Sequence, residues 1–305
     1  MKDFSIITRT KNRPIMLERL FYNLCEQKYR AFEWIIVNDG GEEIDVLDIE
    51  KKAKSCGIDV VLIHNGGSLG RSYSANIGVS HSIGKYILIL DDDDFISIDF
   101  LQKANDFFIH NKDFGAVTCY SQIVNEKIVE GKIINCGNGN VYKPSTSDLS
   151  IIGLHIHNIP TCGLIIRREL FIRAGGYPEF ISCTEDWAFA TKLIQLTNIG
   201  ILSEVLAFIS KRIAPESFYK NTTSDKAGID THLLDELVWK NNRVREELNN
   251  NQIRALLPIL GFIALQNQEI SRQFILLNSI LQKIYRFTGA KTIAMAYRKV
   301  KQYFK

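Results

Sequence analysis

The feature that most constrains the fold is a set of short apolar runs within about the first ninety residues, none of which alternates with polar residues. A strand that is apolar on both sides is buried on both faces, which is typical of a parallel sheet covered by helices. Between the runs lie segments with apolar residues at helical spacing, 15–27 and 72–82. The sequence therefore predicts an α/β fold with a mostly parallel, Rossmann-like central sheet flanked by helices. The expected strands are residues 4–8, 34–37, 60–64 and 86–90.

The second part of the chain is mixed in character. Residues 100–110 are predicted to form a helix, whereas 121–160 is a polar segment rich in Asn and Gly that is either functional or contains an unrecognised element. Helical spacing returns from about residue 225 to the end. We therefore expect one α/β domain over residues 1–220 and a helical extension over 221–305. Further strands are expected at 116–120, 163–167 and 205–209.

The end of the chain is strongly basic. Residues 271–305 contain eight Lys or Arg and no Asp or Glu, whereas the whole chain has a net charge of +3. Within 290–305, apolar and basic side chains lie on largely separate sides of a predicted helix. Such a helix either lies on an anionic membrane surface or packs on the domain with its lysines in water, and a basic tail can also meet the phosphates of nucleic acid.

Composition argues against two classes of protein. The longest apolar stretch, 255–265, is shorter than the roughly 17–25 residues that a membrane span needs, and we expect no secretory signal. The six cysteines are scattered without a CxxC pair, which argues against a zinc site or a disulfide framework. We therefore expect a cytoplasmic protein.

Polar clusters follow the first, second and fourth apolar runs. They are residues 8–13, 38–41 and 91–94. In an open parallel sheet, ligands bind outside the carboxyl ends of the strands. Because all three clusters would lie at that edge, the sequence predicts a single binding site there.

Consecutive aspartates, Asp91 to Asp94, end the fourth run. If the strand continues through them, Asp91 and Asp93 face one side, and Asp92 and Asp94 face the other. Two converging carboxylates suit a hard cation such as Mg²⁺ or Mn²⁺, which is held by one or two carboxylates together with phosphate oxygens of a substrate. The alternative is an acidic turn that starts the next helix.

Two further segments could contact a nucleotide. Asp39 ends the second run, where a carboxylate either accepts hydrogen bonds from a ribose or base edge or forms an Asx turn before two glycines. Residues 65–78 combine a glycine-rich turn, Arg71 and a helix start, which together can make an anion site. Arg13 could act in the same way or lie in water as an ordinary surface side chain.

A second acidic pair, Glu185 and Asp186, precedes a helical pattern at 189–196. The functional interpretation is a general base that takes a proton from an attacking hydroxyl. The structural interpretation is a helix start, with Thr184 as N-cap and both acids complementing the helix dipole. The two imidazoles of the HIH segment, 155–157, share one face of a predicted strand, but no third metal ligand lies near them in the sequence.

Five segments, in order, resemble motifs of the family 2 glycosyltransferases with the GT-A fold. They are SIITRTKNRP (5–14), EWIIVNDGG (33–41), GRSYSANIG (70–78), GKYILILDDDDF (84–95) and GGYPEFISCTEDWAF (175–189). The resemblance covers about residues 1–210. It implies a catalytic domain over 1–220, with a nucleotide-sugar-binding half (1–94) and an acceptor-binding half (95–220).

The resemblance also implies roles for single residues. Asp91 and Asp93 would form the DxD pair and bind Mn²⁺ or Mg²⁺, with Asp93 at the diphosphate. The catalytic pair would be Glu185 and Asp186, with Asp186 as the base. The donor would be bound by Arg9, Thr10, Asn12, Arg13, Asp39, Arg71, Asn76, Asp91 and Asp92.

Two residues depart from the usual family pattern where relatives hold the nucleotide base: Arg9 replaces a proline and Lys11 an aromatic residue. The expected reaction is a metal-assisted single displacement with inversion. It would move a sugar from a nucleoside diphosphate, with UDP as the first choice, to a hydroxyl of a saccharide or lipid-linked saccharide. The expected pathway is cell-surface polysaccharide biosynthesis, and residues 210–218 are the nearest candidate for a lid.

Two alternatives stay open. A sugar-phosphate nucleotidyltransferase is disfavoured because its glycine-rich first loop has no counterpart in 8–14. A non-catalytic nucleotide-sugar-binding relative predicts the loss of one acidic cluster, and both clusters are present. No nucleic acid partner is expected. A membrane-surface contact through 290–305 would place the protein at the inner face of the cell membrane.

Overall fold

The computed structural model describes residues 2–144, 159–213, 231, 234–235 and 238. Contacts within the chain divide it into two compact units, Met1–Lys240 and Asn241–Lys305, and every described residue belongs to the first. The HIH segment and the basic tail lie outside the described residues, as does the domain boundary predicted at residue 220. Within the described part of the chain, no helix is both long and apolar enough to cross a bilayer.

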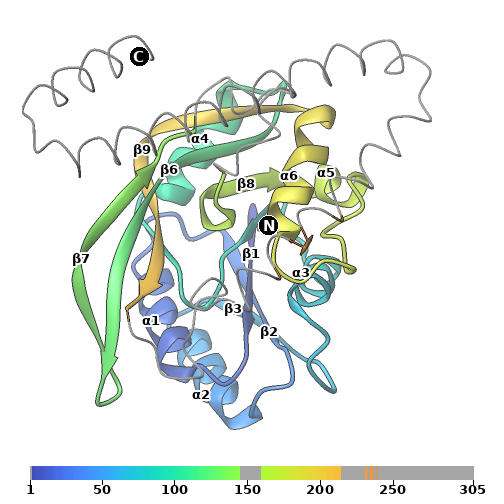
Figure 1. Ribbon diagram of the computed structural model, residues 1–305. Coiled ribbons are helices and arrows are strands. Elements are labelled where there is room, and N and C mark those ends of the chain that lie inside the picture. Colours follow the sequence, from blue (N-terminus) through green and yellow to red (C-terminus); the bar gives the residue numbers. More distant parts are fainter. Residues whose placement is uncertain (1, 145–158, 214–230, 232–233, 236–237, 239–305) are drawn as a thin grey trace, which may run out of the picture. The chain divides into compact units, whose positions relative to one another are not determined.

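The first part of the sheet is parallel and consists of β1 (Phe4–Thr10), β2 (Phe32–Asn38), β3 (Asp59–His64) and β4 (Tyr86–Ile89), in the order β3–β2–β1–β4 (Figure 1). Every residue of β1, β2 and β4 is buried. The prediction of parallel strands covered on both faces is therefore confirmed for this part. At the sheet edge, β3 is only half-buried along most of its length.

The second part of the sheet is mixed and consists of β5 (Phe95–Ile96), β6 (Phe114–Val129), β7 (Lys132–Tyr142), β8 (Leu164–Arg167) and β9 (Asn198–Arg212). Strand β8 joins the two parts because it pairs antiparallel with both β4 and β6. Strand β9 runs parallel to β6, and β5 pairs antiparallel with β9. The described strands thus form one mixed sheet in the order β3–β2–β1–β4–β8–β6–β9–β5, with β7 paired to β6.

Helices cover both faces of this sheet, as predicted (Figure 1). One face packs against α1 (Pro14–Cys25), α2 (Glu43–Ser55) and α4 (Phe100–His110), and the other against α3 (Arg71–Ser80), α5 (Arg168–Arg173) and α6 (Glu185–Leu196). Adjacent residues of a strand point to opposite faces, so Ile6 lies in the same core cluster as Leu20 of α1, whereas Ile7 lies in the cluster that contains Val79 of α3. The chain belongs to the α/β class.

Two of the longer elements do not follow from the sequence patterns. Helix α2 buries only Val46, Ile49 and Ala53, and charged side chains occupy much of the rest of its surface. Strand β7 lies inside the polar segment 121–160, which therefore contains the unrecognised element. It forms a hairpin with β6, and most of its side chains are exposed. Neither element has the continuous apolar pattern that identifies the buried strands.

Candidate functional site

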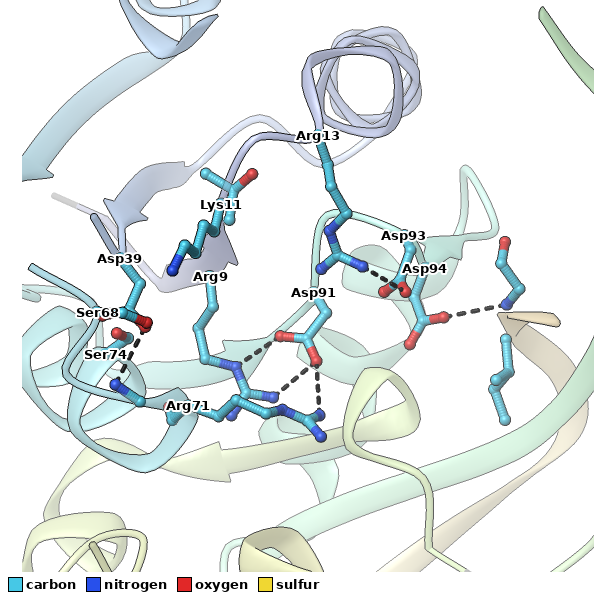
Figure 2. Close-up of a pocket in the computed structure, with 14 residues that line it drawn as sticks. Arg9, Lys11, Arg13, Asp39, Ser68, Arg71, Ser74, Asp91, Asp93 and Asp94 are labelled. Carbon is cyan, nitrogen blue, oxygen red and sulfur yellow. Dashed lines mark hydrogen bonds and ion pairs between the residues drawn. The ribbon is translucent and has the colours of Figure 1, made fainter. Parts of the chain in front are cut away.

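A pocket of about 440 Å³ lies at the edge of the sheet where β1, β2 and β4 end (Figure 2). All three predicted polar clusters contribute to its wall. Asp39, Lys11 and Ser68 lie toward one end, and Asp94 lies toward the other with Ser210 of β9. The lining residues are Arg9, Thr10, Lys11, Arg13, Asp39, Ser68, Gly70, Arg71, Ser74, Asp91, Asp93, Asp94, Ile209 and Ser210.

The four aspartates form a turn and do not continue the strand. Strand β4 ends at Ile89, and the backbone N–H of Asp94 donates a hydrogen bond to the carbonyl oxygen of Asp91 at 3.1 Å. The predicted alternation of the four side chains along a strand is therefore wrong. Asp91, Asp93 and Asp94 all line the pocket, whereas Asp92 is fully buried beneath it.

Arg9, near the end of β1, joins this turn to the start of α6. Its Nε and Nη2 donate to the two carboxylate oxygens of Asp91, each at 2.7 Å, and its Nη1 donates to Oε1 of Glu185 at 2.8 Å. The Arg9 side chain is only 6% exposed. Burial alone would raise the pKa of Asp91, but the contact with Arg9 lowers it below its ordinary value. Asp91 is thus held as a carboxylate by a buried cation.

Asp93 lies between two further arginines. Its Oδ2 accepts hydrogen bonds from Nη1 of Arg13 at 3.1 Å and from Nη2 of Arg212 at 2.5 Å. Burial alone would raise the pKa of Asp93, but Arg13 and Arg212 hold it well below its usual range. Arg13 also pairs with Asp92, with 2.5 Å between Nη2 and Oδ1. Arg212 is missed by sequence reasoning, and its only signal is its place in the basic candidate lid at 210–218.

Asp39 anchors the glycine-rich loop before α3. Its carboxylate accepts hydrogen bonds from the backbone N–H groups of Leu69 (2.8 Å) and Gly70 (3.1 Å), and from the side-chain amide of Asn65 (2.9 Å). Burial alone would raise the pKa of Asp39, but these hydrogen bonds lower it below its ordinary value. The Asx turn predicted for Asp39 is wrong, because the backbone N–H of Gly41 donates to Oδ1 of Asn38 (2.9 Å), whereas Asp39 lines the pocket and holds the loop before α3.

Glu185 and Asp186 open α6, as the structural interpretation of that pair predicts. Their surroundings, however, are those of a charged site. Glu185 is 1% exposed, and its Oε1 lies 3.4 Å from Nε of Arg71 in addition to its contact with Arg9. Asp186 is half-buried, and its Oδ2 accepts a hydrogen bond from the Thr161 hydroxyl at 3.0 Å.

Three predicted donor-binding residues are not on the pocket wall: Asn12, Asn76 and the buried Asp92. The Asn76 amide donates to the carbonyl oxygen of Tyr177 (2.9 Å) and accepts from its backbone N–H (2.8 Å). Asn12 has a φ of 53°, and its side-chain oxygen accepts from the backbone N–H of Glu42 at 2.8 Å. All three fix the segments that surround the pocket.

The carboxylate groups of the aspartate turn could supply a ligand for a divalent cation at one residue. Carboxylate oxygens are the ligands that Mn²⁺ and Mg²⁺ prefer, and these ions usually bind one or two carboxylates together with substrate phosphates. Both oxygens of Asp91 are occupied by Arg9, whereas the two arginines at Asp93 contact Oδ2. Among the residues that the structure describes, no group of three or more acidic, His or Cys side chains is arranged to hold a metal. Asp94 also lines the pocket, but its Oδ1 accepts a hydrogen bond from the backbone N–H of Ser210. Oδ1 of Asp93 would therefore be the oxygen offered to a cation together with phosphate oxygens.

Solved structures identify the class of protein to which this fold belongs. TarS 1–349 of Staphylococcus aureus in complex with UDP-GlcNAc superposes with a TM-score of 0.58 at 20% identity, covering 78% of this chain and 66% of that chain. The mannosyltransferase PcManGT of Pyrobaculum calidifontis, in complex with GDP-Man and Mn²⁺, gives 0.57 at 16% identity, covering 79% and 64%. The fold is thus the GT-A fold of glycosyltransferases. The match spans less than two thirds of either solved chain.

Sequence comparison then gives the family. Residues 5–175 match Glycosyl transferase family 2, and the chain belongs to this family. An uncharacterised glycosyltransferase of Haemophilus influenzae is 26% identical over 228 residues, 74% of each protein. The poly(ribitol-phosphate) beta-N-acetylglucosaminyltransferase TarS of S. aureus is 23% identical over 236 residues, 72% of this chain and 39% of TarS. The family resemblance seen in the sequence motifs is confirmed, and the chain is a glycosyltransferase.

Proposed function

We propose that this chain is an inverting enzyme that moves a sugar from a nucleoside diphosphate, with UDP as the first choice, to a hydroxyl group of a saccharide. One observation carries the proposal. In a chain of family 2, Asp39 and the aspartate turn line one pocket, and Arg9 connects that turn to Glu185, the neighbour of Asp186 in the sequence. The two solved structures of similar fold hold UDP-GlcNAc and GDP-Man, which supports a nucleotide-sugar donor.

The nucleoside belongs at the Asp39 end of the pocket and the diphosphate at the Asp93 end. Arg71 is 42% exposed on the wall between them, and Lys11 lies toward the Asp39 end (Figure 2). Cationic side chains on the wall of a partly enclosed pocket favour a diphosphate through charge-assisted hydrogen bonds. Asp39 shapes the nucleoside end by holding the glycine-rich loop in place.

Asp186 acts as the general base. The Thr161 hydroxyl orients its carboxylate, which takes the proton of the acceptor hydroxyl as that oxygen attacks the anomeric carbon. A single displacement without an enzyme nucleophile inverts the anomeric centre, as in inverting glycosidases. A bound Mn²⁺ or Mg²⁺ would neutralise the charge that develops on the departing diphosphate, and Asp93 is the residue that would hold it.

The acceptor is a saccharide or a lipid-linked saccharide of a cell-surface polysaccharide. A relative whose name specifies a polymeric acceptor, TarS, supports this choice. The basic amphipathic pattern of residues 290–305 supports attachment to the inner face of the cell membrane. Flotation with anionic and neutral vesicles tests the attachment. Binding to anionic vesicles only, lost when Arg298, Lys299 and Lys301 are replaced by Gln, is the expected result, and no binding to either kind contradicts it.

The donor site is tested by thermal shift with UDP, GDP and dTDP, each with and without Mn²⁺. A nucleotide that raises the melting temperature, and raises it further with Mn²⁺, is expected; no shift with any of them would refute the donor site. Release of nucleoside diphosphate from matching sugar nucleotides, in the presence of mixed saccharide acceptors, then tests the base. Asp186→Asn should keep nucleotide binding and lose about 100-fold or more in turnover. Asp106→Asn, an exposed control on α4, should leave both unchanged.

A further inference from the structure

Arg9 touches three separate segments of the chain with one guanidinium group. Besides its two hydrogen bonds to Asp91 and its bond to Glu185, its Nη1 donates to the backbone carbonyl oxygen of Arg71 at 3.1 Å. In the sequence, Asp91 lies 82 residues from Arg9, Glu185 lies 176 residues away and Arg71 lies 62 residues away. All three guanidinium nitrogens of Arg9 are therefore engaged within the protein.

The two arginines at this point of the pocket have different access to a ligand. The Arg9 side chain is 6% exposed, whereas that of Arg71 is 42% exposed. An arginine binds a phosphate or a carboxylate best through two parallel N–H groups, and Arg9 already presents such a pair to Asp91. Arg71 also lies near Asp91 and Glu185, but at the longer distance of 3.4 Å. It is thus the arginine more accessible to a diphosphate, whereas Arg9 is placed to hold protein groups.

We propose that Arg9 is a positioning residue, which fixes the first turn of α6, and with it Asp186, relative to the aspartate turn. This inference rests on the proposed function, in which Asp186 is the base. Glu185 and Asp186 are adjacent at the start of α6, so a shift of Glu185 away from Arg9 moves Asp186 as well. Misplacing a reacting group by about 1 Å can slow a reaction about 100-fold.

The carboxylates of Asp91 and Glu185 share the guanidinium group of Arg9. The positions of its three nitrogens therefore determine whether both contacts can form at once. A lysine at position 9 keeps the positive charge, but its single ammonium group cannot reproduce two parallel bonds to Asp91 together with a bond to Glu185. Arg9→Lys therefore separates geometry from charge. A full truncation such as Arg9→Ala would leave the two buried carboxylates with only their 3.4 Å contacts to Arg71, so unfolding would obscure its effect.

The test compares the wild type, Arg9→Lys and a matched control, Arg173→Lys, in which an exposed arginine of α5 is changed in the same way. Four quantities are measured on the full chain: the melting temperature, the Kd of the stabilising nucleotide, the kcat and KM for the donor, and hydrogen exchange of residues 183–192. Arg9→Lys should keep Kd and KM within about threefold and lower kcat about tenfold or more. It should also speed exchange in 183–192 and leave 101–109, inside α4, unchanged.

Two outcomes would overturn the proposal. A loss of nucleotide affinity as large as the loss of kcat would make Arg9 a donor ligand, and unchanged kcat with unchanged exchange in 183–192 would leave it without a positioning role. If Arg9→Lys does not fold, Arg9→Met combined with Glu185→Gln removes one charge of each sign. That variant should bind nucleotide and lack turnover, and near-normal turnover would overturn the proposal. If the wild type neither binds nor converts a sugar nucleotide, the proposed function is wrong. The exchange measurement would still show whether the contact of Arg9 with Glu185 fixes the start of α6.

Discussion

The ion pair between Arg13 and Asp92 allows the stability of the aspartate turn to be predicted quantitatively. Asp92 is fully buried, with 2.5 Å between its Oδ1 and Nη2 of Arg13, and its Oδ2 accepts a hydrogen bond from the Thr10 hydroxyl at 2.7 Å. Arg13→Met leaves this carboxylate with a neutral partner only. Breaking a buried ion pair by removing one partner costs about 3–5 kcal/mol. Because the Arg13 side chain is 20% exposed, water can partly replace it, and we expect the lower end, about 3 kcal/mol.

Urea unfolding measures this cost. Burial raises the pKa of Asp92 to about 7, with the contact with Arg13 opposing the shift, so the measurement belongs at about pH 8.5, where the carboxylate of the wild type is charged. Asp92→Asn keeps the size of the side chain and an acceptor for Thr10, and combining it with Arg13→Met should recover about 1–2 kcal/mol. Lys54→Met is the matched control, because Lys54 pairs with Glu50 on the surface of α2 at 2.7 Å, and it should cost about 0.5 kcal/mol or less.

A cost of Arg13→Met no larger than that of Lys54→Met would show that the buried ion pair does not stabilise the turn. If Asp92→Asn recovers nothing in the double variant, the cost does not come from an unpaired buried charge. Both outcomes are measured as shifts in the urea concentration at the midpoint of unfolding. The dependence of the free energy of unfolding on urea concentration must stay unchanged, since a changed slope would indicate a different unfolded state.

Three further predictions concern two residues of the pocket wall and the packing of α3 against the sheet. Asp39→Asn should speed amide exchange in residues 65–70. Because the pKa of Asp39 is lowered in the folded protein, the slower exchange of the wild type should be seen above about pH 4. It should disappear as the pH falls through the pKa of Asp39 in the folded protein. Gly78→Ala should cost about 1–3 kcal/mol in urea unfolding, since its Cβ would lie 2.5 Å from a side-chain atom of β1, whereas Gly66→Ala, with open space around it, should change little. Arg71→Gln should weaken nucleotide binding about tenfold by calorimetry, and equal affinity would exclude its contact with phosphate.

The parallel half of the fold is predictable because burial on both faces leaves a direct trace in the sequence. Strands β1, β2 and β4 contain long apolar runs, and each run extends to the strand seen in the structure with small changes at its ends. Helix α2 and strand β7 leave no such trace. Helix α2 buries only one narrow stripe of side chains. Strand β7 is ordered by its pairing with β6, and such a pairing cannot be predicted from the local sequence.

The site is predictable in its location and less so in its contacts. Polar residues at the carboxyl ends of parallel strands must meet, so Arg9, Asp39 and Asp91 come together as expected. The aspartate turn is not predictable from alternation, because nothing local shows that β4 ends at Ile89 before the aspartates begin. The contact between Asp93 and Arg212 depends on the return of β9 to the pocket after 119 residues, which only the complete sheet determines.

The end of β9 also offers a place for an optical reporter. Ile213 is 49% exposed, and its backbone N–H is fixed to the carbonyl oxygen of Glu126 on β6 at 2.7 Å, while the preceding Arg212 contacts Asp93. A fluorophore attached to a cysteine introduced by Ile213→Cys would be anchored through a rigid backbone one residue from that contact. Once the exposed Cys56 and Cys136 and the half-buried Cys25 and Cys183 are replaced by serine, a change in its emission on adding a nucleotide would test occupancy of the pocket without any acceptor or turnover.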